Sequence, residues 1–268
     1  MTMIHSCGMD ERGVSEAIGF LLIFTMVIVG IGLVTLYGYP MLIEQQVNAD
    51  EKIMEKNMIV LQNDVKSLSY KTVPYKETSL KVGGGALTVY NTQSVPAVSS
   101  IDITDCLGTP YVSAFHSGDL RYSSASAGTD ISLQNGAVVK RQVAQTGSVM
   151  LAEPRWFYDA DTNTMVINLI GINSTGILAK SGISTVQMAM GETNYTYIPL
   201  VAGNSLCLKY TPDPTPEGQN YQGAWDNYFR NSMKMAPTAT ANEYRFPTDT
   251  LRDTTLVIKK YDIVIKSL

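Results

Sequence analysis

The sequence predicts an α+β protein in which a long N-terminal α-helix precedes an antiparallel all-β, sandwich-like head. Three observations support this prediction. An uncharged apolar run extends from Ala17 to Ile43, and a seven-residue apolar repeat then continues to about Tyr70. Beyond Pro74 the apolar period changes to short alternating stretches separated by turn-forming residues. About 220 residues follow the apolar run, which is enough for a head with its own core.

The apolar run is long enough to cross a bilayer, because a helix rises about 1.5 Å per residue and the hydrocarbon core is about 30 Å thick. It is bounded by Glu16 and Glu44. A cleaved secretory signal has a shorter apolar core and a small-residue cut site, and this run has neither property. We therefore expect it to stay in membrane lipid as a single-pass span. The mixed charges before it do not determine its orientation.

Proline is expected to distort the end of this span. Pro40 lacks an N–H and clashes with the preceding helical turn, so the sequence predicts a kink over Tyr37–Pro40. Tyr37 and Tyr39 suit the aromatic belt at a membrane surface.

The segment from Glu44 to about Tyr70 predicts an amphipathic extension of the helix. It lacks Pro and Gly, and its apolar residues form one stripe: Val47, Met54, Met58, Leu61, Val65 and Leu68. The stripe can pack on the protein's own β-domain or on neighbouring subunits as a stalk. Packing on its own domain is favoured, because Asp50 or Glu51 would interrupt one seam of a coiled coil.

The head is expected to consist of short strands joined by hairpin-like turns. The predicted strands are Leu80–Val82, Leu87–Tyr90, Val98–Ile103, Ser148–Leu151, Trp156–Tyr158, Met165–Leu169, Val186–Met190, Tyr195–Leu200, Leu206–Tyr210, Leu256–Ile258 and Asp262–Ile265. One helical island is predicted at Gly223–Met235, and the last two strands can also be one. Gly83–Gly85 is read as a turn rather than a phosphate loop, because no Lys-Ser/Thr follows it.

Cysteine usage leaves two alternatives open. Cys106 and Cys207 lie in the head, where they can form a disulfide or remain two separately buried thiols. Cys7 precedes the apolar run, which argues against a lipoprotein cysteine. No cysteine or histidine spacing indicates zinc.

Several patterns imitate a catalytic or metal site without completing one. Asp159–Asn163 resembles the start of a calcium loop, but the sixth position is not glycine and the twelfth is Ile170, so a hairpin turn is expected. His116–Asp119 places the residue types of a triad side by side without a nucleophile elbow. We therefore predict no enzyme, cofactor or metal, and no small-molecule substrate is identified.

Charge excludes a nucleic-acid binder. Residues 1–45 contain one of the 20 basic and four of the 24 acidic residues, which leaves 19 basic against 20 acidic residues in the rest. A nucleic-acid partner requires a clustered basic face.

Two triplets, Asn173-Ser174-Thr175 and Asn194-Tyr195-Thr196, match the acceptor pattern for N-linked glycan. In an extracellular head, Asn173 and Asn194 are candidate glycosylation sites. Such triplets also arise by chance in Ser/Thr-rich chains.

The junction before the apolar run is more specific. It reads Arg12-Gly13-Val14-Ser15-Glu16-Ala17-Ile18-Gly19, in which R-G is followed by V-S-x-x-I-G. This resembles the class III leader of archaeal type IV pilins and pilin-like proteins. The resemblance implies that a prepilin peptidase cuts between Gly13 and Val14. Glu16 stands where many archaeal pilins carry proline, and in a filament it would pair with the new α-amino group of a neighbouring subunit and set the register. The alternative is a charge at headgroup level.

With this resemblance the chain divides into a leader at 1–13, a transmembrane or assembly helix at 14–43, an amphipathic extension at 44–73 and an extracellular β-rich head at 74–268. The favoured hypothesis is a minor or accessory subunit of a pilus-like filament, with a structural or adhesive role and with related pilin subunits as partners. The alternative is a single-pass membrane protein whose extracellular head binds a ligand without polymerising. A surface hydrolase is the third hypothesis, and no recognisable site supports it.

Overall fold

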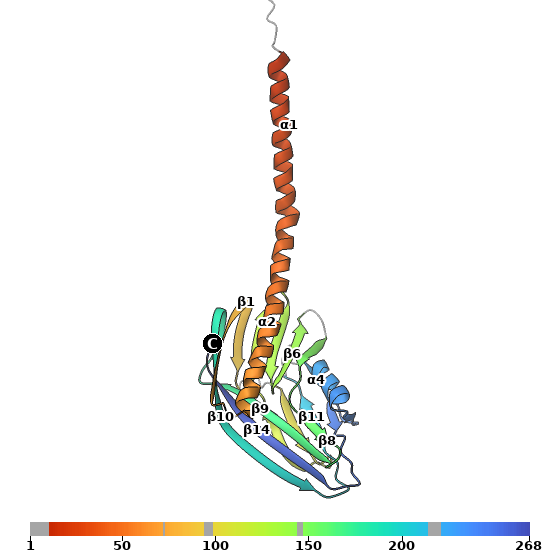
Figure 1. The fold of residues 1–268 in the computed structure, drawn as a ribbon. Coiled ribbons are helices and arrows are strands. Elements are labelled where there is room, and N and C mark those ends of the chain that lie inside the picture. Colours follow the sequence, from red (N-terminus) through yellow and green to blue (C-terminus); the bar gives the residue numbers. More distant parts are fainter. Residues whose placement is uncertain (1–10, 72, 94–98, 144–146, 214–220) are drawn as a thin grey trace, which may run out of the picture. The chain divides into compact units, whose positions relative to one another are not determined.

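The computed structural model describes residues 11–71, 73–93, 99–143, 147–213 and 221–268, with the side chains of 11–14 left aside. It confirms the α+β class: helices come first, and a mostly antiparallel β-domain follows (Figure 1). The chain forms two compact units, Met1–Ala49 and Asp50–Leu268. The second unit starts inside the predicted amphipathic extension, so this part of the helix belongs with the head.

The N-terminal unit is helical. It contains α1 (Glu11–Leu33), a π-helical turn η1 (Val34–Gly38) and the first residues of α2 (Tyr39–Tyr70). The expected effect of Pro40 takes a different form, because the backbone stays helical through this residue and the irregularity lies one turn earlier. The Tyr39 N–H bonds to the Val34 carbonyl, five residues back. A π-turn changes the hydrogen-bond register, so the helix accommodates the missing proline donor without ending.

The rest of α2, from Asp50 on, packs on the head through its predicted stripe. Five of the apolar residues named for this stripe are buried: Met54, Met58, Leu61, Val65 and Leu68. Gln62 is also buried, and its Nε2 donates to the carbonyls of Gly136 at 2.7 Å and Glu153 at 3.0 Å. Glu51 and Glu55 both form ion pairs with Lys140. The stripe therefore packs on the protein's own β-domain, which is the alternative that the sequence favoured.

The larger sheet has nine strands in the order β7-β6-β5-β4-β1-β10-β14-β9-β8. All its pairs are antiparallel except β14 with β9. Its strands are β1 (Tyr75–Tyr90), β4 (Asp119–Ser124), β5 (Thr129–Gln134), β6 (Ala137–Gln142), β7 (Ser148–Ala152), β8 (Phe157–Asp159), β9 (Thr164–Ser174), β10 (Ala179–Leu200) and β14 (Thr254–Ser267).

The smaller sheet has the order β12-β13-β11-β2-β3. Its strands are β2 (Ser100–Thr104), β3 (Pro110–His116), β11 (Cys207–Thr211), β12 (Ala236–Pro237) and β13 (Glu243–Arg245). The predicted helical island is confirmed as α4 (Gln222–Asn227) followed by the π-turn η2 (Tyr228–Ser232).

Two hydrophobic cores lie on opposite faces of the larger sheet. One joins the stripe of α2 to residues such as Val138 and Ile170. The other joins the opposite face, through residues such as Val139 and Leu169, to the smaller sheet and to Trp225 of α4. Because side chains alternate along a strand, neighbouring residues serve different cores. The head is therefore a sandwich of two sheets with a helix on its outer face.

Three strand predictions need correction. The region between Ile103 and Ser148 was expected to contain no strand, but it holds β3, β4, β5 and β6. Gly83–Gly85 is not a turn, because β1 runs through it with a bulge between Val82 and Leu87. A Cβ at Gly85 would lie 2.3 Å from the Ser123 carbonyl oxygen. These glycines therefore allow β1 to approach β4 closely. The strands predicted separately at Val186–Met190 and Tyr195–Leu200 are parts of one strand, β10, and the C-terminal stretch, left open as one or two strands, is the single strand β14.

Candidate functional site

The most distinctive feature of the N-terminal unit is its uncovered apolar surface. The helix is long and apolar enough to cross a membrane, and its most hydropathic window has no buried part. Phe20, Leu21, Leu22 and Ile23 are between 64% and 72% exposed, and the remaining large hydrophobic residues to Ile43 are exposed as well. Because successive helical residues are rotated by about 100°, these four cover all sides of the helix.

The two threonine hydroxyls of this segment are satisfied within the helix. The hydroxyls of Thr25 and Thr35 donate to the carbonyls of Leu21 and Ile31 at 2.7 and 2.9 Å. Moving each large apolar side chain out of water contributes about 1.5–3 kcal/mol, so the free energy of covering the segment is large. Lipid tails and apolar helices of other subunits can both cover it.

The residues predicted for processing and register lie at the start of this segment. Arg12, Gly13 and Val14 belong to the backbone of α1, and their side chains lie outside the described residues. Glu16 is exposed and forms no ion pair with any side chain described from Ser15 onward. Among the described side chains, none occupies or covers the Glu16 carboxylate, so it is accessible to a group outside this chain.

The two cysteines of the head are joined. Cys106 and Cys207 form a disulfide with Cα atoms 4.9 Å apart, the first of the two alternatives that the sequence left open. The register of β2 and β11 explains the proximity, because Cys207 pairs with Thr104 and Cys106 follows in the next turn. Asp105 orders that turn by accepting from the N–H groups of Leu107 and Thr109.

The two candidate glycosylation sites differ in accessibility. Asn194 lies on β10, opposite Lys260 of β14, and its side chain is exposed. Asn173 lies near the end of β9 and is partly buried. Its Oδ1 accepts from both the N–H and the hydroxyl of Thr92, at 3.1 and 2.8 Å. The Asn173 amide is therefore part of a structural contact.

The segment that imitates a calcium loop is the turn between β8 and β9, as expected. Asp159 is occupied within the turn, where it accepts from the Asp161 N–H and the Thr162 hydroxyl. The Arg252 guanidinium donates to the carbonyls of Ala160 and Asp161 at 2.7 and 3.2 Å. An arginine thus binds two backbone carbonyls of this turn and ties it to the loop before β14. Over the described ranges, no cluster of three His, Cys, Asp or Glu residues is placed to hold a metal.

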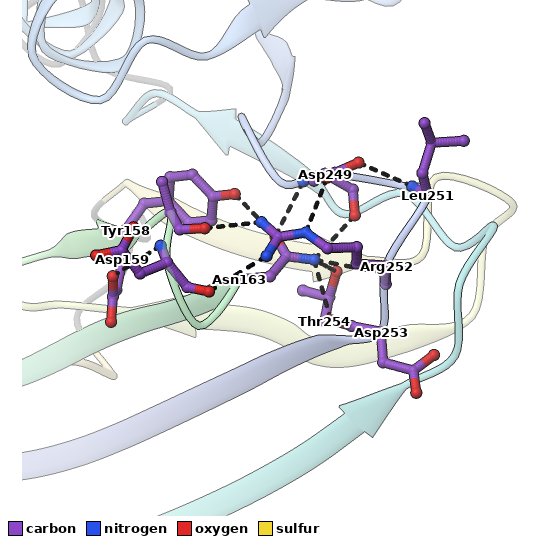
Figure 2. Close-up of polar contacts among 10 residues, drawn as sticks. Tyr158, Asp159, Asn163, Asp249, Leu251, Arg252, Asp253 and Thr254 are labelled. Carbon is purple, nitrogen blue, oxygen red and sulfur yellow. Dashed lines mark hydrogen bonds and ion pairs between the residues drawn. The ribbon is translucent and has the colours of Figure 1, made fainter.

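Asn163 closes this turn and joins it to the loop before β14 (Figure 2). Its Oδ1 accepts from the Tyr158 hydroxyl at 2.8 Å and from the Asp249 N–H at 2.9 Å. Its Nδ2 donates to the Asp249 carbonyl at 2.8 Å and to the Thr254 hydroxyl at 2.8 Å. The residue is 1% exposed and has a positive φ of 49°, a conformation that asparagine tolerates. Sequence reasoning treated it only as a turn residue.

A buried polar cluster between the two layers was also missed. Arg121 forms ion pairs with Asp119 at 2.7 Å and with Asp213 at 3.6 Å, and Arg141 pairs with Asp130. Ser132 donates to Asp119 at 2.6 Å. All these residues are less than 9% exposed.

The charges in this cluster depend on one another. Burial raises the pKa of Asp119, while Arg121 and Ser132 act in the opposite direction. Burial opposes the charge of Arg121, but the Asp119 carboxylate raises the pKa of the guanidinium overall. Asp119 therefore forms a structural ion pair with Arg121. The Ser117 hydroxyl donates to the Gly118 carbonyl. These contacts do not assemble a triad from His116–Asp119.

Comparison with known proteins places the chain in one family over most of its length. Residues 12–263 match the family of unknown function DUF7289, so the chain belongs to this family. No curated protein and no solved structure matches the chain.

Proposed function

We propose that this protein is an archaeal type IV pilin-like surface protein, a minor or accessory subunit with a structural or adhesive role. The observation that carries the proposal is the uncovered apolar segment of α1, which follows the Arg12-Gly13 junction within a few residues. A prepilin peptidase would remove the leader, and the helix would wait in lipid until it packs against related subunits.

The distribution of apolar surface supports assembly through α1. A filament core requires a helix that is apolar on all sides, because each helix there contacts several neighbours. The segment from Phe20 to Ile23 has this property. The stripe of α2 is used within the head and is not free to form a stalk with other chains. Subunit contacts would therefore concentrate on the apolar segment before Glu44.

Cleavage at the junction is tested by the mature N-terminus. In an archaeal host with a prepilin peptidase, mass spectrometry of the membrane-extracted protein is expected to identify Val14 as the first residue. Gly13→Val is expected to leave the leader in place, because the peptidase would require the small residue. Gly30→Val is the matched control: Gly30 lies outside the V-S-x-x-I-G motif and a Cβ there has no heavy atom within 4 Å, so this variant should be cleaved normally. An intact Met1 in the wild type would contradict the proposal.

Assembly is tested separately by electron microscopy of material sheared from the cell surface. Filaments labelled by an antibody to the head are expected, with label at ends or at sparse positions for a minor subunit. A protein that starts at Val14 but stays entirely in the membrane fraction would overturn polymerisation and support the anchored binding protein.

A further inference from the structure

The larger sheet has a groove beside the end of α2, on the face that this helix covers elsewhere. Figure 1 shows β9, β10 and β14 continuing past the C-terminal end of α2. Tyr70 and Tyr261, whose ring centroids are 5.5 Å apart, both line the groove. Its volume is about 460 Å³, within the usual range for ligand sites.

Strand register arranges the side chains of this groove in rows. One row crosses four strands, with Tyr197 opposite Val257, Val257 beside Val166, and Val166 opposite Phe157. The two valines are each 9% exposed, whereas Tyr197 and Phe157 are 56% and 49% exposed. Val166 and Val257 therefore form an apolar floor with Phe157 at one side, and Tyr197 continues the row beyond the residues that line the groove. In the next row, Tyr195 lies opposite Lys259, which lies beside Asn168.

The charged groups of the groove are cations. Lys259 lies over the Tyr195 ring at 5.9 Å, and Arg155 lies over the Tyr70 ring at 5.0 Å. No carboxylate of the described chain forms an ion pair with either side chain. A third cation, Lys66, lies near Arg155. Burial is the main cause that lowers the pKa of Lys66, the Arg155 guanidinium lowers it further, and Glu153 raises it. A ligand with negative charge would be complementary to this end of the groove.

We propose that this groove binds an acidic oligosaccharide. Sugar rings have apolar C–H faces that pack on exposed aromatic rings, and polar edges that need hydrogen-bonding groups. Tyr195 and Phe157 supply the aromatic faces, and Asn168 of β9 lies beside Lys259, where its Nδ2 donates to the Arg155 carbonyl and holds that segment at the groove. Lys259 and Arg155 bind the carboxylates of the sugar chain. The groove lies wholly within the head, so the proposed binding does not depend on whether the protein polymerises. Its test is also independent of leader cleavage.

The test is a titration of the full-length protein in detergent micelles with trigalacturonic acid, followed by calorimetry and by NMR of tyrosine signals. Maltotriose is the neutral control sugar. Trigalacturonic acid is expected to bind, with affinity that falls as salt is raised, and maltotriose is expected to bind more weakly.

Variants locate the site. Tyr195→Ala is expected to weaken binding by about tenfold, because it removes an aromatic face. Lys259→Gln is expected to weaken binding and to reduce its salt dependence. Tyr75→Ala on β1 and Lys209→Gln on β11 are matched controls, since both residues are exposed elsewhere on the head, and both should bind as the wild type does.

Three results would overturn the proposal. The first is no binding of trigalacturonic acid at millimolar concentration by a protein with unchanged circular dichroism. The second is unchanged affinity in both groove variants. The third is binding of an acidic proline-rich peptide at the groove in preference to either sugar, which would make it a peptide site.

Discussion

Asn163 and Thr254 are separated by 91 residues in the chain, and the Asn163 Nδ2 donates to the Thr254 hydroxyl at 2.8 Å (Figure 2). This contact fixes where β14 begins beside β9, because the Thr255 N–H also bonds to the Asn163 carbonyl. The parallel pair of β9 and β14 then continues to Ile265. One buried amide thus sets the register that builds the floor of the groove.

Asn163→Asp is therefore expected to destabilise the head by about 3 kcal/mol, because it replaces a donor with a carboxylate that faces backbone carbonyls. Asn163→Gly should also destabilise it, since glycine keeps the positive φ but loses the amide contacts. Urea unfolding of the full-length protein measures both effects. The exposed control Asn194→Asp should stay close to the wild type, and an Asn163→Asp variant as stable as this control would show that the network is dispensable.

The disulfide is expected to contribute to stability through the length of chain that it closes. Cys106 and Cys207 are 101 positions apart, and constraining such a loop in the unfolded state stabilises a protein by about 2–5 kcal/mol. Replacing both residues with serine should lower the urea midpoint by a corresponding amount. The wild type treated with reductant should match the double variant, whereas Cys7→Ser should have no effect. Equal midpoints with and without reductant would contradict the prediction.

Glycan is expected on Asn194 and not on Asn173 if the host modifies this head. The Asn173 side chain is held by Thr92, so Asn173→Ala should cost about 1–2 kcal/mol of unfolding free energy, whereas Asn194→Ala should cost little. Mass spectrometry of glycopeptides from the native host identifies the modified residue. Glycan on Asn173 in the folded protein would mean that this contact opens.

Tyr221 is expected to make the head less stable at alkaline pH. Burial raises its pKa above the ordinary value of 10.0, and its hydroxyl is among the buried groups without a described partner. Because the folded state holds this proton more tightly than the unfolded state, stability is fully present below pH 10 and is lost as pH rises above it. Tyr221→Phe removes the titrating group and should reduce the alkaline loss of stability. Unfolding midpoints at pH 8 and pH 11 measure the difference. An equal alkaline loss in Tyr221→Phe and the wild type would assign the effect to other buried tyrosines.

Much of the fold follows from local patterns in the sequence. The stripe from Met54 to Leu68 identified the buried face of α2, because helical periodicity depends only on residues three and four apart. The turn at Asp159–Asn163 was recognisable for a similar reason. The hairpin of β5 and β6 was missed, although Asn135-Gly136 at its turn has the positive φ values typical of such a turn and was a usable signal.

The rest could not be predicted from local patterns. Asp119, Arg121, Asp130 and Arg141 resemble a solvated surface in sequence. The Asp119–Arg121 pair lies within β4, but Arg141 finds Asp130 on the neighbouring strand and Arg121 finds Asp213 from a distant segment, so their burial depends on the tertiary structure. The groove likewise depends on register across four strands, which no single strand contains.

The sequence by itself determined the uncharged apolar helix, the Arg12-Gly13 junction, the inward face of α2 and the change to strands after Pro74. Each of these follows from the spacing of residue types along one segment. Only the tertiary structure decided which charges are buried, that Cys106 meets Cys207, and that Tyr195, Lys259 and Phe157 share one face. The physical reason is that these properties depend on which strands lie side by side, and pairing between distant segments is settled when the whole core forms.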